Sequence, residues 1–137
     1  MSRDRIRQLT VAHQSLLASL DQIQPLLRSY SQAKPKLRDF QLKVLAHVGF
    51  QNNDFYAPLF TFFDGERQDL KMLESLQTDL KNVKIETLVF FERHSGEMDD
   101  HHSRNFPKDF TDFTKLWVGR IQLEENFLFP LLEKFEN

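Results

Sequence analysis

Two oppositely charged residues, Arg120 and Glu124, occupy core-facing positions of the last predicted helix. They lie one turn apart and continue the three- and four-residue spacing of its apolar side chains, which are Phe110, Phe113, Trp117, Phe127 and Leu131. An isolated charge in a hydrophobic core costs several kcal/mol, so each of the two needs a partner or a metal ion. The spacing therefore predicts a polar site inside the fold.

Four helices must position this site. Apolar residues recur at intervals of three and four residues over the segments 4–28, 35–62, 68–94 and 107–131. Pro35 and Pro107 are expected to open the second and fourth helices, because proline is favoured in a first turn. The three links are fairly short, which favours antiparallel neighbours. We expect an all-α protein, an antiparallel up-down-up-down four-helix bundle, in one domain over residues 1–137.

Every predicted helix carries polar residues near its midpoint. The core-facing ones, from the first, second and fourth helices, are His13, His47, Gln51, Arg120 and Glu124, and on the third helix Asp79 flanks the apolar stripe. An up-down bundle brings the midpoints of its helices to one level. These side chains are therefore predicted to form one buried polar layer.

The layer has two chemical interpretations. Histidine and carboxylate ligands suit iron or zinc, and bundles hold such metals with inward pairs spaced by three or four residues. His13, His47 and Glu124 are candidate ligands on this basis, and Asp79 is a candidate fourth. The alternative is a metal-free network in which Arg120 pairs with Glu124 or Asp79 and the histidines are hydrogen-bonded.

Composition narrows the class of protein. The 137 residues carry a net charge of −2, which argues against a nucleic-acid partner, and the absence of cysteine removes disulfides and thiolate ligands. No apolar run is long enough for a signal peptide or a membrane span, so we expect a cytoplasmic protein without a membrane partner. We find no phosphate-binding loop or nucleophile motif and predict no catalytic residues and no enzyme.

The polar positions carry a family resemblance. The runs VAHQSLL at 11–17, HVGFQNNDFY at 47–56 and RIQLEENFLFP at 120–130 resemble the motifs of hemerythrin-like proteins, the HHE cation-binding domain. The resemblance implies a four-helix bundle and metal ligands at His13, His47, Glu124 and Asp79. It implies iron, in a mononuclear or degenerate di-iron site, or zinc.

The chain departs from that family at two of these positions. Gln51 stands where the family has a carboxylate, and Arg120 stands where it has a histidine. An arginine cannot ligate a cation and repels it, so Gln51 and Arg120 are expected to support or ion-pair with the site. The resemblance therefore implies a sensor or regulatory protein with a partly lost di-iron site, in place of an oxygen carrier.

A second resemblance leads to a different function. LRDF at 37–40, with Tyr56 further along the helix, and RIQLEE at 120–125 resemble bacterial regulators that bind the housekeeping sigma factor of RNA polymerase. This resemblance implies a metal-free bundle in which Arg120 and Glu124 pair internally. Function would then lie on a surface that holds a protein partner.

Two further groups of residues, one aromatic and one histidine-containing, have compositions found at binding sites. Phe60, Phe62 and Phe63 close the second predicted helix, where they either pack as core or form an exposed patch for a protein partner or a homodimer. His101 and His102 lie in a polar connection, 97–105, that we interpret as a solvated acidic segment.

Overall fold

The computed structural model describes residues 4–94 and 100–136, and for residues 100–103 it describes the backbone alone. Within these ranges the protein is helical and has no strand, which confirms the all-α class. The long helices are α1 (Asp4–Ile23), α2 (Tyr30–Phe50), α4 (Arg67–His94) and α5 (Asp100–Leu123). The short ones are the 3₁₀ turn η1 (Gln24–Leu26), α3 (Asn53–Phe62), the π-helical turn η2 (Glu124–Leu128) and α6 (Phe129–Glu136).

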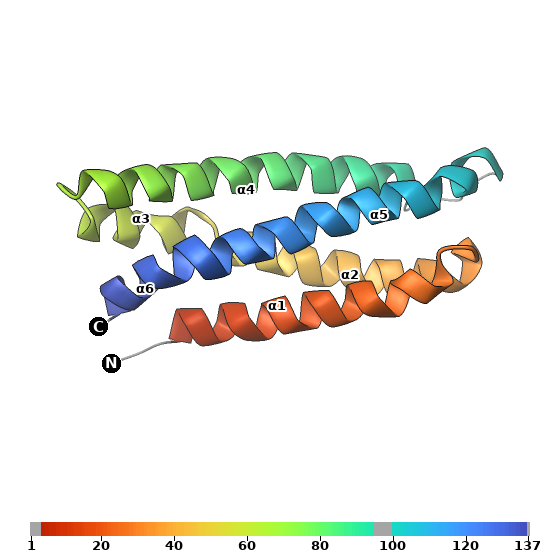
Figure 1. Ribbon diagram of the computed structural model, residues 1–137, viewed down its shortest axis with the longest axis horizontal. Helices are drawn as coiled ribbons and strands as arrows, with labels where there is room; N and C mark the ends of the chain where they lie inside the picture. The colour runs from red at the N-terminus through yellow and green to blue at the C-terminus, as the bar shows by residue number, and fades with distance from the viewer. Residues whose placement is uncertain (1–3, 95–99, 137) are drawn as a thin grey trace.

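The four long helices lie side by side along the length of the molecule (Figure 1). Helix α1 packs against α2, and α4 packs against α5. Helix α3 follows α2, and η2 and α6 continue α5, so that α1 begins and α6 ends at the same end (Figure 1). None of the helices in the described ranges combines the length and apolar character that crossing a bilayer requires.

The core is rich in phenylalanine, as the composition suggests. Phe90 of α4 stacks on Phe113 of α5 with ring centroids 4.0 Å apart and planes 4° from parallel. Phe40 of α2 meets the same Phe113 edge-on at 5.8 Å. Each buried ring of this size contributes about 1.5–3 kcal/mol through the hydrophobic effect. This packing holds α2, α4 and α5 together on one side of the polar layer.

The second predicted helix is divided into two helices in the structure. Helix α2 ends at Phe50, and the Asn52 side chain accepts a hydrogen bond from the Phe55 N–H, which caps a new helix. The prediction of one helix over 35–62 is therefore wrong at this point. Pro58 lies inside α3 and does not end it.

The predicted helix starts at proline are also wrong. Helix α2 already begins at Tyr30 and α5 at Asp100, with Pro35 and Pro107 inside them, so residues 30–34 and 100–105 of the predicted links are helical. Pro35 is the sixth residue of α2 and Pro107 the eighth of α5, so each removes one i→i−4 hydrogen bond of its helix. The fixed φ of proline is itself helical, which helps both helices to accommodate the ring.

The π-helical turn η2 changes which side of the last helix faces the core. The Phe129 N–H donates to the Glu124 carbonyl, five residues earlier, which widens the turn by one residue. As a result Leu128 is buried and Phe127 is 44% exposed. The prediction that Phe127 faces the core is wrong for this reason. Pro130 follows directly, and its ring opposes an ordinary α-helical turn before it.

Candidate metal centre

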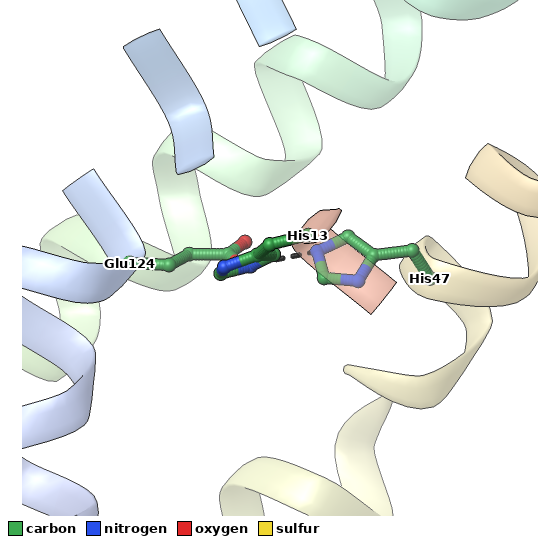
Figure 2. Close-up of side chains that lie close together, drawn as sticks. All are labelled: His13, His47 and Glu124. Atoms are coloured by element: carbon green, nitrogen blue, oxygen red, sulfur yellow. Dashed lines mark hydrogen bonds and ion pairs between the residues drawn. The ribbon is translucent and has the colours of Figure 1, made fainter. Parts of the chain in front are cut away.

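Three buried side chains converge from three segments of the chain. His13 comes from α1, His47 from α2, and Glu124 is the first residue of η2 (Figure 2). Glu124 Oε1 lies 2.6 Å from His13 Nε2 and 3.0 Å from His47 Nε2. One ligand-type atom from each of the three residues lies within 4.8 Å of the other two. The predicted polar layer thus brings three of the four candidate ligands to one point.

The second oxygen of Glu124 is held by two other members of the layer. Arg120 Nε donates to Oε2 at 2.6 Å, and Gln51 Nε2 donates to the same oxygen at 2.8 Å. The carboxylate therefore has partners on both oxygens: the two histidines at Oε1, and Arg120 and Gln51 at Oε2. This arrangement compensates the burial of its charge.

Arg120 uses its guanidinium to join the layer to α4. Its Nη1 donates to the Leu76 carbonyl at 2.9 Å and to Asp79 Oδ2 at 3.1 Å, and its Nη2 donates to Gln51 Oε1 at 3.0 Å. Arg120 therefore pairs with both Glu124 and Asp79. The Asp79 side chain is 43% exposed and lies at the outer end of the guanidinium, apart from the three converging residues.

The two histidines differ at their other ring nitrogen. His13 Nδ1 lies 2.7 Å from Glu125 Oε2, and its ring stacks on Phe129 with centroids 5.6 Å apart. His47 Nδ1 is buried and has no hydrogen-bond partner among the described residues. The helical spacing does not predict the contact of Glu125 with His13, because adjacent residues of an ideal α-helix, such as Glu124 and Glu125, point in different directions. The sequence feature that could have indicated this contact is the pair Glu124-Glu125 shortly before Pro130, which disturbs a regular helix.

Burial and neighbouring charged groups shift the pKa values of His13 and Glu124. Burial lowers the pKa of His13, but hydrogen bonds and attraction from Glu124 and Glu125 outweigh this and raise it. Burial raises the pKa of Glu124, but hydrogen bonds from His13 and His47 and the charge of Arg120 outweigh this and hold it far below its usual range. In the metal-free protein both shifts favour the charged forms, an imidazolium at His13 and a carboxylate at Glu124.

These shifts make the stability of the metal-free protein depend on pH in two directions. The Glu124 contribution is present above its unfolded pKa and is lost as the pH falls toward its lowered folded pKa. The His13 contribution is present below its unfolded pKa and is lost as the pH rises through its raised folded pKa.

Tyr56 closes the layer from α3. Its hydroxyl donates to Gln51 Oε1 at 3.1 Å, and its side chain is buried. Burial raises the pKa of Tyr56 to about 12, although the charge of Arg120 opposes this effect. Burial likewise raises the pKa of Tyr30, the other tyrosine of the chain.

We expect the native protein to resist tyrosine ionisation. At pH 10, where about half of an unperturbed tyrosine is ionised, native protein should show little tyrosinate absorbance, and urea-unfolded protein should show about half of the full signal. A Tyr56→Phe variant should remove the component that ionises near pH 12. A native titration that coincides with the unfolded one would contradict the burial of the Tyr56 hydroxyl.

The three phenylalanines at the end of the second predicted helix do not join the centre. Phe63 is buried, Phe60 is partly buried and Phe62 is 51% exposed, so the three divide between core and surface. The side chains of His101 and His102 lie outside the described residues.

No family model, no curated protein and no solved structure matches the chain. The assignment of function therefore depends on the chemistry of the centre itself. Two imidazoles and one carboxylate form a donor set that suits a single iron or zinc ion. The same three groups, with Arg120 and Gln51, also form a closed hydrogen-bonded network.

Proposed function

We propose that the protein is a hemerythrin-like, antiparallel up-down-up-down four-helix bundle that binds one iron or zinc ion through His13, His47 and Glu124. Its role is sensing or regulation, and not oxygen carriage. The observation that carries the proposal is the convergence of these three buried ligand-type atoms within 4.8 Å. The placement of the helices in Figure 1, with α1 beginning where α6 ends, supports the bundle order.

The spacing of the donor atoms supports metal insertion with small movements. Zinc–ligand bonds of about 2.0–2.1 Å at tetrahedral angles separate the ligand atoms by roughly 3.4 Å. The Glu124 Oε1 atom lies 2.6 and 3.0 Å from the two histidine Nε2 atoms. These two separations therefore need to lengthen by less than 1 Å to accommodate the ion. Glu125 already holds the other nitrogen of His13, as carboxylates commonly do for metal-bound histidines.

Arg120 and Gln51 explain why the proposal is limited to one metal and excludes oxygen carriage. They occupy the positions at which the hemerythrin-like motif has further ligands, and the guanidinium lies 2.6 Å from Glu124 Oε2. Its charge opposes a second cation and the open coordination position that catalysis or oxygen binding needs. It also keeps Glu124 ionised, which favours one cation at Oε1.

Metal titration of the purified protein tests this proposal. After dialysis against a chelator, Zn²⁺, and Fe²⁺ without oxygen, should each bind at one equivalent, and a His13→Ala/His47→Ala variant should lose that equivalent. A matched His101→Ala/His102→Ala variant should keep it. Loss of binding in the control pair, with binding retained in the first, would place the metal elsewhere and overturn the proposal.

One observation favours a metal-free alternative. Both oxygens of Glu124 and all three nitrogens of Arg120 have hydrogen-bond partners without any ion. In this alternative the network fixes helix register, and the protein acts as a regulator that binds a partner such as the housekeeping sigma factor. Capture of that sigma factor by an Arg120→Met/Glu124→Leu variant as well as by the natural protein would favour this alternative. Absence of capture by the natural protein would remove it.

A further inference from the structure

A hollow on the surface between α1 and α2 is not used by the metal proposal. It has a volume of about 550 Å³, and its walls are mostly apolar, including Val11 and Ala12 from α1 and Ala46 and Phe50 from α2. The small side chains of Ala12 and Ala46 leave this space open between the two helices. His47 also lines it, so an occupant would lie against a proposed metal ligand.

Two cations line the hollow without carboxylate partners. Lys43 of α2 donates to the hydroxyl of Ser19 at 2.9 Å, and this neutral group is its partner within the described residues. Arg7 of α1 is exposed and forms no ion pair with any described residue. Lys43 and His47 are four residues apart on α2, so they share one face of the helix. An apolar hollow with unpaired positive charge is complementary to an amphipathic anion.

We propose that this hollow binds a small amphipathic monocarboxylate, with its apolar chain against Val11, Ala46 and Phe50 and its carboxylate on Lys43. The ammonium has three N–H donors, so it can keep the Ser19 hydroxyl and add an ion-paired hydrogen bond to the carboxylate. The volume of the hollow lies within the range of about 300–1,000 Å³ that is usual for small-molecule sites. This size favours a small molecule over a partner helix.

Calorimetric titration with sodium octanoate tests the hollow, with 1-octanol and octylammonium as ligands of the same chain length. The chelator-treated protein should bind octanoate at one saturable site, octanol more weakly, and octylammonium not at all. A Lys43→Met variant should bind octanoate about tenfold more weakly, and Ala46→Trp, which fills the hollow, should abolish binding. The matched surface variants Lys36→Met and Ala18→Trp should bind as the natural protein does.

The outcomes separate this inference from the metal proposal. Octanoate binding that is lost in Ala46→Trp supports the hollow, whether or not the same protein takes up Zn²⁺. A protein that takes up one Zn²⁺ but no octanoate overturns the hollow and leaves the metal site standing. Equal binding of octanoate and octylammonium, or equal binding by Lys43→Met and Lys36→Met, would also overturn it, because the charge of Lys43 would then play no part.

Discussion

Replacement of Glu124 by leucine alone is expected to lower the free energy of unfolding of the metal-free protein by about 3–5 kcal/mol. The variant leaves the guanidinium of Arg120 buried without its 2.6 Å carboxylate partner, and it removes the acceptor shared by His13 and His47. Asp79 remains as a second anion for Arg120, but its side chain is 43% exposed and compensates less of the burial cost. Urea unfolding in the presence of a chelator measures the change.

A double-mutant cycle shows how much of that loss belongs to the pair. Arg120→Met/Glu124→Leu should recover more than half of the loss of Glu124→Leu, because well-packed apolar residues replace a buried ion pair at little cost. Arg120→Met alone should be intermediate, since Glu124 keeps its two histidines and Gln51. Strictly additive single-site losses would contradict the interaction between Arg120 and Glu124 on which the network depends.

The second large effect concerns the pH dependence of metal binding. A metal ion at Nε2 requires neutral His13, whereas Glu124 and Glu125 raise the pKa of this imidazole. Below that raised pKa, each unit of falling pH should weaken Zn²⁺ binding by up to about tenfold through His13 alone. Affinity should therefore increase with pH and level off once His13 has lost its proton.

Glu125→Gln tests the cause of this profile. The Glu125 side chain is 44% exposed, and removing its charge lowers the pKa of His13, so the level region should extend to lower pH. The exposed Glu74→Gln, on α4 away from the centre, should leave the profile unchanged. Competition with a chelator of known affinity, at several pH values, gives the profiles. If the profile of Glu125→Gln matched that of the natural protein, the proton that the metal displaces would not be on His13.

Much of the centre was predictable from periodicity. His13, His47, Gln51, Arg120 and Glu124 all fall on the three- and four-residue spacing of core positions, and all five are buried in the structure. The prediction succeeds because a charged or polar residue at a core position needs hydrogen-bond or ion-pair partners that are also in the core. Asp79, which only flanks its stripe, accordingly lies at the edge.

Local backbone irregularities explain what the spacing did not reveal. The π-helical turn before Pro130 exposes Phe127 in place of burying it, and it lets both Glu124 and Glu125 reach the same histidine. The cap at Asn52 divides the second predicted helix and starts α3, from which Tyr56 reaches the layer. Such features depend on single hydrogen bonds and on proline sterics, which a regular period does not encode.

Anomalous X-ray diffraction from crystals of zinc-loaded protein, measured at the zinc absorption edge, tests the central claim most directly. We predict one anomalous peak between α1, α2 and η2, with His13 Nε2, His47 Nε2 and one Glu124 oxygen about 2.0–2.2 Å away. Arg120 should still contact the other Glu124 oxygen. A peak at any other group of residues, or none between the three side chains while they keep their metal-free hydrogen bonds, would contradict a metal-binding centre.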